Sequence, residues 1–189
     1  DDARKYFSTD GSVFELMPSI IVYPRNENDV RKTARFSWQL AERGRVIPIT
    51  ARGKGTDQAG AALGNGIIMS FPGHMSRILE LDGKTGSVTI EPGIIYAKLQ
   101  QTLQTHGRFL PPFPSSIEFS TLGGAIANNA GGERSLSYGQ TVEYVRAVRA
   151  VCSDGGEYAF GPLTKPQLDA KMAQQNCEGD LYRKMYDLV

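Results

Sequence analysis

The sequence predicts an α+β protein with two lobes, a small βαβ lobe over about residues 15–80 and a larger, mainly antiparallel lobe with helices over about residues 81–165. In the first lobe, two apolar runs flank a segment with helical spacing within about 30 residues, which is typical of a βαβ unit. In the second lobe, two pairs of strand-like segments flank short turns rich in glycine, which is typical of β-hairpins. We expect residues 166–189 to form a helical tail and the chain to be a single domain.

Three apolar runs predict the strands of the first lobe: residues 19–23, 45–50 and 66–71. Asn26 is a residue type that caps helices, and it precedes a stretch in which apolar residues recur at helical spacing as far as about Arg43. Gly44 then stands where helices commonly end in a left-handed residue. Pro48 lies inside the second run and weakens the strand there, because proline has no backbone N–H group.

Four segments predict the strands of the second lobe: residues 77–81, 87–91, 141–151 and 157–160. The first two flank the turn Asp82-Gly-Lys-Thr-Gly86, and the last two flank the turn Ser153-Asp-Gly-Gly156. Between the two hairpins, apolar residues recur at helical spacing over residues 95–103, and Gly107 ends this predicted helix.

The composition excludes several classes of protein. The 189 residues are 40% hydrophobic and 22% charged, as in folded proteins rather than disordered ones. The net charge of +1 and the lack of a basic block exclude a nucleic-acid partner, and no apolar run is long enough to span a bilayer. With two cysteines and two histidines, we expect no disulfide framework, no metal site and a cytoplasmic location. Peripheral attachment of a longer parent protein to a membrane is an alternative.

Glycine is concentrated in two clusters, which indicates that the backbone there approaches another group closely. The first cluster, Arg52-Gly-Lys-Gly-Thr-Asp-Gln-Ala-Gly60, follows the second predicted strand. It differs from the dinucleotide-binding fingerprint, because position 58 is Gln and no helix begins there. It also differs from the P-loop, because Gly55 follows Lys54 where serine or threonine is required.

A loop of this kind can point successive backbone N–H groups toward an anion. Arg52 and Lys54 add positive charge, and Thr56 adds a hydroxyl donor. The alternative interpretation is a loop that only connects two strands. The first cluster alone does not separate the two interpretations.

The second cluster, Leu122-Gly-Gly-Ala-Ile-Ala-Asn-Asn-Ala-Gly-Gly132, combines small side chains with two amides. Small side chains let a flat, bulky ligand approach the backbone, and Asn128 and Asn129 can donate and accept hydrogen bonds at its edges. The alternative is a glycine-rich turn followed by a tightly packed helix. Together, the two clusters predict an elongated ligand with an anionic middle.

A series of motifs in one order carries a resemblance to a known family. They are Ile49-Thr-Ala-Arg-Gly-Lys-Gly-Thr-Asp-Gln-Ala-Gly60, Glu91-Pro-Gly93, Pro111-Pro-Phe-Pro-Ser-Ser116, Thr121-Leu-Gly-Gly124, Asn129-Ala-Gly-Gly132 and Tyr138-Gly139. Over about residues 15–160, the chain resembles the FAD-binding domain of the FAD-linked oxidases, the vanillyl-alcohol oxidase or PCMH-type group. Within that group it is similar to the D-lactate dehydrogenase, glycolate oxidase and D-2-hydroxyglutarate dehydrogenase branch, as is the segment Tyr6-Phe-Ser-Thr-Asp10. The resemblance implies the two-lobed PCMH-type fold.

The resemblance also implies which residues bind the cofactor FAD. Those expected at its diphosphate, mainly through backbone amides, are Arg52, Gly53, Lys54, Gly55, Thr56, Asp57, Gln58 and Gly60. Those expected around the flavin and its ribityl chain are Pro114, Ser115, Ser116, Thr121, Gly123, Gly124, Asn128, Asn129, Ala130, Gly131 and Gly132. Those expected near the adenosine or the wall of the cofactor site are Tyr138, Gly139 and Val142.

Three positions separate this chain from other members of the group. Some members attach the flavin covalently through a histidine in the first cluster, and Thr56 at the matching position implies non-covalent FAD. Lys54 stands where glycine is usual, so its side chain must point away from the diphosphate or contact it as a cation. Phe113 stands where an acidic residue is more common.

The resemblance implies a FAD-dependent oxidoreductase acting on CH–OH donors. Such an enzyme would oxidise a D-2-hydroxy acid of the lactate, glycolate or 2-hydroxyglutarate type by hydride transfer to flavin. Family members are usually longer, and a C-terminal cap domain supplies the substrate pocket and most catalytic groups. No pairing of a histidine with an acid suited to take a hydroxyl proton is evident. We therefore expect the missing cap domain to supply the catalytic residues, and this chain alone to be inactive. The full-length protein would act on a small 2-hydroxy acid and pass the electrons to a quinone, an iron–sulfur centre, another protein or oxygen.

Two alternatives stay open on the sequence. One is the FAD domain of another flavoprotein, of the UDP-N-acetylenolpyruvoylglucosamine reductase or sugar-lactone oxidase type. The other is a non-catalytic nucleotide-binding module that no longer holds flavin. Substrate turnover by the full-length protein distinguishes the first alternative from an oxidoreductase of D-2-hydroxy acids. A flavin titration distinguishes the second alternative from any protein that binds FAD.

Overall fold

The computed structural model of the chain describes residues 1–188 and divides into two compact units. One unit comprises Asp1–Asn26 and Ile47–Val145, and the other comprises Glu27–Val46 and Arg146–Val189. Helices and strands occur in both units, and the chain carries parallel as well as antiparallel sheets, which confirms the predicted α+β class. The limits of the predicted lobes stay a prediction.

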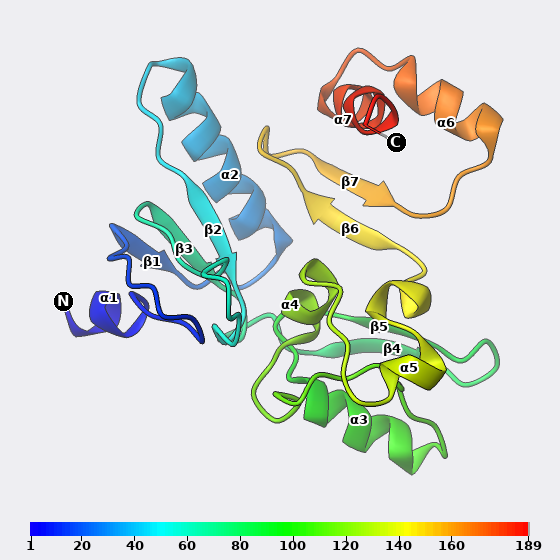
Figure 1. Ribbon diagram of the computed structural model, residues 1–189. Coiled ribbons are helices and arrows are strands. Elements are labelled where there is room, and N and C mark those ends of the chain that lie inside the picture. Colours follow the sequence, from blue (N-terminus) through cyan, green and yellow to red (C-terminus); the bar gives the residue numbers. More distant parts are fainter. Residues whose placement is uncertain (189) are drawn as a thin grey trace. The chain divides into compact units, whose positions relative to one another are not determined.

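A three-stranded parallel sheet lies in the first unit. It consists of β1 (Ile20–Val22), β2 (Ile49–Arg52) and β3 (Ile67–Ser70), in the order β1-β3-β2 (Figure 1). Every residue of β3 is buried, as expected for the middle strand of a parallel sheet. The three predicted strands are confirmed, and β2 ends where the first glycine cluster begins.

Strand β2 begins later than predicted, at Ile49 rather than at residue 45. Pro48 is the physical reason, because it has no N–H group to donate to the neighbouring strand. Its carbonyl oxygen still accepts a hydrogen bond of 2.9 Å from the N–H group of Ile67. The chain therefore already runs beside β3 at Pro48, and the regular ladder starts one residue later.

The same unit contains the antiparallel hairpin of β4 (Ile78–Asp82) and β5 (Ser87–Ile90), with helices α3 (Tyr96–Thr105) and α4 (Leu122–Ala127) (Figure 1). Apolar side chains of the two helices and the turn before α3 form the buried core, namely Ile94, Tyr96, Leu99, Leu103, Leu122 and Ala125. Apolar side chains of both strands pack against this core. The predicted hairpin and the predicted helix that Gly107 follows are confirmed.

Helix α3 holds the segment that contains the motif Pro111–Ser116. The fully buried Tyr96 donates its phenol O–H to the carbonyl oxygen of Pro112, and burial raises the pKa of that phenol. Gln100 donates to the carbonyl oxygen of Leu110 at 2.7 Å and accepts from its N–H group at 2.8 Å. Because both side chains are fixed on the helix, they set the position of this segment next to the second glycine cluster.

The single strand predicted over residues 141–151 is wrong in its first half. Residues Thr141–Tyr144 form a 3-10 helix, η1, which follows the short helix α5 (Ser135–Tyr138). Glu143 accepts a hydrogen bond of 3.0 Å from the N–H group of Gln140, which closes the start of this turn. Local polar contacts of this kind outweigh the apolar alternation that suggested a strand.

The second unit contains helix α2 (Glu27–Glu42) and the antiparallel hairpin of β6 (Val148–Val151) and β7 (Glu157–Phe160). Helix α2 contacts β6, and Arg149 on that strand pairs with Glu27 at 3.4 Å. The predicted helix that starts after Asn26 and the predicted second hairpin are thus confirmed.

The remaining helices of the second unit are α6 (Lys165–Met172) and α7 (Cys177–Tyr186), which pack together. Lys171 and Glu178 form an ion pair between them, and the Glu178 side chain is buried. These helices account for most of the stretch that was expected to be a helical tail.

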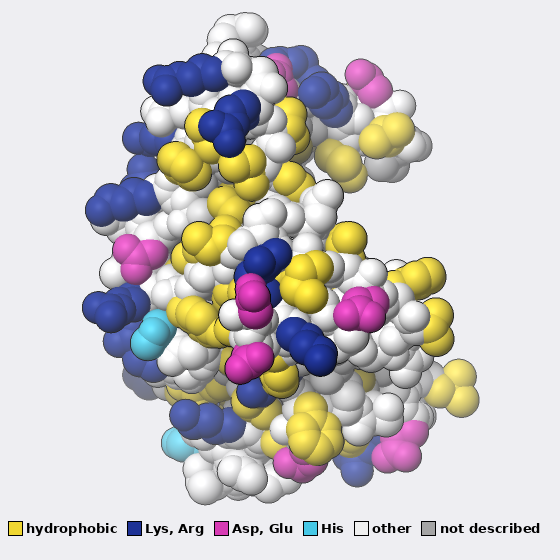
Figure 2. Space-filling view, turned by 90° about the vertical axis from the view of Figure 1, so that its left-hand side faces the viewer, with side chains coloured by type: hydrophobic (Ala, Val, Ile, Leu, Met, Phe, Trp, Pro, Cys, Tyr) yellow, Lys and Arg dark blue, Asp and Glu magenta, His cyan; other side chains and the backbone are white. Residues whose placement is uncertain are grey.

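Several large hydrophobic side chains are exposed, and Leu136 is the most exposed of them, at 97%. On the face shown in Figure 2, hydrophobic side chains lie among cationic and acidic ones. Within residues 1–188, none of the helices combines the length and the apolar character needed to cross a membrane.

The replacement Leu99→Ala should lower the free energy of unfolding by about 2–5 kcal/mol, because it leaves a cavity in the core of the first unit. Leu99 is 1% exposed in the structure. The matched control is Leu136→Ala, for which we expect a change within about 0.5 kcal/mol. Urea denaturation followed by circular dichroism measures both values, and similar effects of the two replacements would contradict the core described above.

Candidate functional site

The first glycine cluster presents a run of unpaired backbone donors. Within the described chain, the N–H groups from Gly53 to Gln58 donate no hydrogen bond to another residue. Gly55 lies in this run with a φ of +71°, a left-handed conformation that suits glycine. Successive N–H groups around a left-handed residue form a concave donor surface that binds anions. The loop therefore has the arrangement of donors that the predicted anion cradle requires.

Arg52, at the end of β2, has a structural role that the sequence did not reveal. Its side chain is 4% exposed and donates to the carbonyl oxygens of Thr9 at 2.8 Å, Ala62 at 3.2 Å and Phe7 at 3.4 Å. The guanidinium also lies 5.1 Å from the centre of the Phe7 ring. Burial lowers the pKa of Arg52, and the negative charge of Asp10 partly offsets this effect by raising it. The guanidinium points toward the protein, so the charge expected at the loop surface is left to the exposed Lys54.

The two glycine clusters meet in the first unit. A Cβ atom at Gly53 would overlap the side-chain oxygen of Thr121, so only glycine permits this approach. The side chain of Asn128 donates a hydrogen bond of 2.8 Å to Oδ1 of Asp57. The structure therefore places the clusters side by side, although the Asp57–Asn128 hydrogen bond spans 71 positions of the sequence.

Asp57 also stabilises its own loop. Its Oδ2 atom accepts hydrogen bonds of 2.8 Å from the N–H groups of both Ala59 and Ala61. These bonds lower the pKa of the Asp57 carboxyl group, with the bond from Ala61 as the largest cause and the bond from Asn128 as a smaller one. A carboxylate so engaged orders the loop and leaves the anion cradle to the backbone.

The second cluster begins with a capped helix. Thr121 precedes α4, is 2% exposed, and accepts a hydrogen bond of 3.2 Å from the N–H group of Gly124. A Cβ atom at Gly123 would lie 2.7 Å from the Pro92 carbonyl oxygen, which shows how closely α4 packs on that motif. A tightly packed helix is present, but it forms the first part of the cluster, whereas the alternative interpretation placed the helix after a glycine-rich turn.

The motif Glu91-Pro-Gly93 is held in place through the buried side chain of Glu91. Arg77 donates to its carboxylate from the side chain at 2.7 Å and from the backbone N–H group at 2.8 Å. The hydrogen bond from the Arg77 side chain is the main cause that lowers the pKa of Glu91. This pair holds the strand end on which Pro92 and helix α4 rest.

The end of the second cluster is joined to the two other segments that were predicted for the site. Asn129, with a φ of +46°, donates to Gln140 at 2.6 Å and accepts from the N–H group of Val142 at 2.9 Å. A Cβ atom at Gly132 would overlap the carbonyl oxygen of Phe113. The predicted residues around positions 114–116, 128–132 and 138–142 are thus neighbours. Among the contacts of the described chain, none joins Lys54 or Gln58 to the second cluster.

The N-terminal segment after α1 (Asp2–Tyr6) also backs the first cluster, which the motifs did not predict. A Cβ atom at Gly11 would lie 2.8 Å from the carbonyl oxygen of Asp57. Gly60 lies against the ring of Phe14, where a Cβ atom would be 3.0 Å from the nearest ring carbon. A single glycine after Asp10 looks like an ordinary turn in the sequence, so only the fold reveals its contact with the loop.

Comparison with known proteins agrees with this geometry. The profile of the family described as FAD binding domain matches residues 18–160. D-2-hydroxyglutarate dehydrogenase of Escherichia coli (strain K12) is 37% identical over 183 residues, which are 97% of this chain and 18% of that protein. Glycolate oxidase subunit GlcD of Bacillus subtilis (strain 168) is 35% identical over 144 residues, which are 75% of this chain and 29% of that protein. The chain therefore spans less than a third of the length of either relative.

A solved structure shows the same fold. Alkyldihydroxyacetonephosphate synthase superposes with a TM-score of 0.74 and 22% identity, covering 86% of this chain and 31% of that one. Together with the matched family profile, this similarity confirms the predicted PCMH-type fold.

Replacing Arg52 by methionine should destabilise the first unit and loosen the first cluster. The carbonyl groups of Phe7, Thr9 and Ala62 would lose their donor, and each that water cannot reach costs about 1–3 kcal/mol. The control is Arg45→Met, since Arg45 is exposed. Thermal unfolding and amide hydrogen exchange of residues 53–60 measure the effect. Equal stability and exchange in the two variants would show that Arg52 does not hold the loop.

The contribution of Asp57 should depend on pH. Its pKa is lowered in the folded state, so its stabilising effect is fully present above its unfolded pKa of about 3.9 and is lost as the pH falls through the folded value. Asp57→Asn should therefore be less stable than the wild type at pH 7, with the difference shrinking toward pH 3. Urea unfolding at both pH values measures it, and a constant difference would contradict the assigned contacts.

Proposed function

The chain belongs to the family of FAD binding domains, and from this premise we propose that it holds the FAD of an enzyme that oxidises a D-2-hydroxy acid. The observation that carries the proposal is the run of unpaired N–H groups from Gly53 to Gln58 beside the small residues of the second cluster. A diphosphate requires several donors close together, and a flat ring system requires backbone without bulky side chains. The residues present fit both requirements.

The proposed contacts follow from the geometry of the first unit. The backbone from Gly53 to Gln58 would bind the diphosphate, with Lys54 as an added cation. The second cluster, the segment 114–116 and the segment 138–142 would surround the flavin and the rest of the cofactor. Arg52 and Asp57 would position the first cluster rather than contact the ligand, because their polar atoms are already bonded to protein groups.

We propose that FAD is held without a covalent bond. Thr56 offers a hydroxyl group in the loop where some relatives of this group carry the attaching histidine. When bound, FAD supplies the acceptor for a hydride from the carbon that bears the hydroxyl group. The residues of this chain orient the ring system and surround it with protein. No side chain of the described chain is proposed as the base that takes the hydroxyl proton.

The substrate class and the partners are part of the proposal. The names of the relatives indicate 2-hydroxy acids as substrates. They are D-2-hydroxyglutarate, glycolate and, for a protein of Anaerostipes hadrus that is 38% identical over 111 residues, D-lactate. That last match covers 58% of this chain and 23% of that protein. Because the relatives are much longer, we propose that a cap domain binds the substrate and that a separate group accepts the electrons. The free thiols Cys152 and Cys177 support a reducing, cytoplasmic location.

A flavin titration tests the cofactor assignment. Lys54→Glu should weaken FAD binding at least about tenfold, since a charge-assisted contact contributes about 1.5–3 kcal/mol. Gly55→Val should abolish binding, because a Cβ atom there would overlap the Arg52 guanidinium and the φ is +71°. The quenching of FAD fluorescence measures the affinity.

The matched control for the second variant is Gly44→Val, which has a φ of +80° and open space around it in the second unit. It should lose stability through backbone strain and still bind FAD. Unchanged FAD affinity in both Lys54→Glu and Gly55→Val would show that the first cluster does not bind the cofactor.

A further inference from the structure

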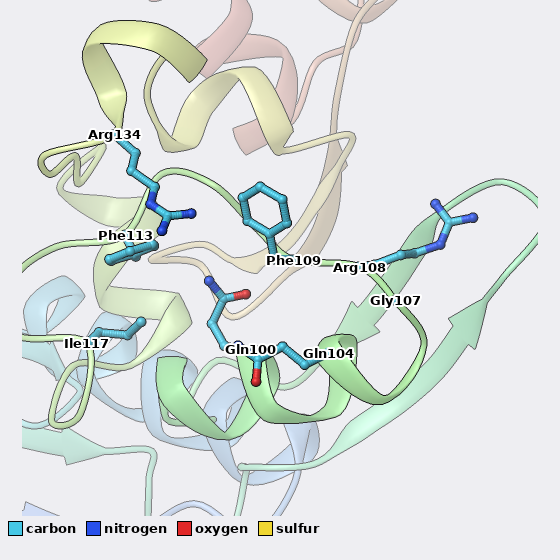
Figure 3. A pocket seen from close by; sticks show the side chains of 8 residues that line it. All are labelled: Gln100, Gln104, Gly107, Arg108, Phe109, Phe113, Ile117 and Arg134. Atoms are coloured by element: carbon cyan, nitrogen blue, oxygen red, sulfur yellow. The ribbon is translucent and has the colours of Figure 1, made fainter.

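A pocket with a volume of about 440 Å³ lies in the first unit, between helix α3, the segment after it and the start of α5 (Figure 3). Its volume falls in the range of roughly 300–1,000 Å³ that is usual for small-molecule sites. Phe109, Phe113 and Ile117 supply apolar walls, and Arg134 supplies positive charge. None of the residues that line the pocket is acidic.

Arg134 is held in place by aromatic rings rather than by an acid. Its guanidinium carbon lies 5.6 Å from the centre of the Phe109 ring and 5.4 Å from the centre of the Phe113 ring. Figure 3 shows its side chain directed toward these rings. Within the part of the chain that the structure describes, the guanidinium has no ion pair and donates no hydrogen bond. Stacking on rings leaves the N–H groups at its edge available to a ligand.

The other polar side chains of the pocket are engaged or turned away. Gln100 uses both ends of its amide on the backbone of Leu110. Arg108 donates to the carbonyl oxygen of Gly83 at 2.7 Å and points away from the pocket in Figure 3. Arg134 is therefore the charged group that can recognise a ligand, and Gln104 also lines the pocket.

We propose that this pocket binds a small organic carboxylate, with Arg134 as the donor of two parallel hydrogen bonds and the phenylalanine rings against the carbon skeleton. A planar guanidinium matches the geometry of a carboxylate, and the apolar walls can contact the carbon skeleton of the ligand. Only the identity of the acid rests on the proposed function: a 2-hydroxy acid of the substrate class is the candidate. Arg134 would then add a specificity-determining contact two residues after the second glycine cluster.

The arginine side-chain N–H signals in nuclear magnetic resonance spectra test the proposal directly. Sodium D-2-hydroxyglutarate is titrated into the chain at constant ionic strength, and the Arg134 signal is assigned by its loss in Arg134→Gln. We expect a saturable shift of this signal, with binding in the millimolar range. The backbone N–H signals of Phe109 and Phe113, which line the pocket and remain in both variants, report binding by the variants. Binding should weaken at least tenfold in Arg134→Gln and remain unchanged in the exposed control Arg45→Gln. A shift that does not saturate, or equal binding by both variants, would overturn the proposal.

Two further measurements distinguish a carboxylate site from a part of the FAD site and from a site for any anion. Arg134→Gln should keep its FAD affinity within about threefold, and a loss of FAD binding together with acid binding would make the pocket part of the cofactor site and overturn the proposal. Inorganic phosphate should bind more weakly than the carboxylate, and equal binding would overturn the assignment of the ligand class. If the wild-type chain bound no FAD, the proposed function would fail while the acid titration still tested the pocket.

Discussion

The close approach of the two glycine clusters is the constraint on which the site depends. Gly53 and Thr121 lie so close that any side chain at position 53 would separate them, and the hydrogen bond between Asp57 and Asn128 joins the same two segments. One segment leaves the end of β2 and the other opens α4. The cradle can therefore form only when the parallel sheet and the helical core of the first unit are both folded.

The burial of Arg52 explains how the loop can be rich in glycine and still be ordered. Glycine loses more conformational freedom on folding than other residues, so such a loop needs strong contacts elsewhere. The carbonyl groups of Thr9 and Ala62, which lie before and after the loop in the sequence, both accept hydrogen bonds from the Arg52 guanidinium. The Asp57 carboxylate accepts a hydrogen bond from the N–H group of Ala61. The side chains of Arg52 and Asp57 serve the scaffold, which leaves the backbone donors of Gly53 to Gln58 available to a ligand.

Side chains that serve the scaffold and backbone groups that stay available suit a domain that binds a cofactor. The fold and the matched family profile concern the binding of FAD, whereas the chain spans 18% of the D-2-hydroxyglutarate dehydrogenase of Escherichia coli. Under the proposed assignment, the domain would hold the cofactor mainly through its backbone and leave the chemistry of the substrate to other groups. The pocket around Arg134 is where we propose that this domain itself contributes to recognition of the substrate.

The sequence by itself determined the α+β class, the strands and helices with strong periodicity, and the two glycine clusters, because each depends on local spacing of residues. Only the tertiary structure decided the direction of Arg52, since carbonyl groups of Thr9 and Ala62 on either side of it in the sequence attract it inward. The same holds for the turn at Thr141–Tyr144, where Asn129 binds the N–H group of Val142 and helps to replace the expected strand. Contacts between distant segments settle such details, and a local pattern carries no information about them.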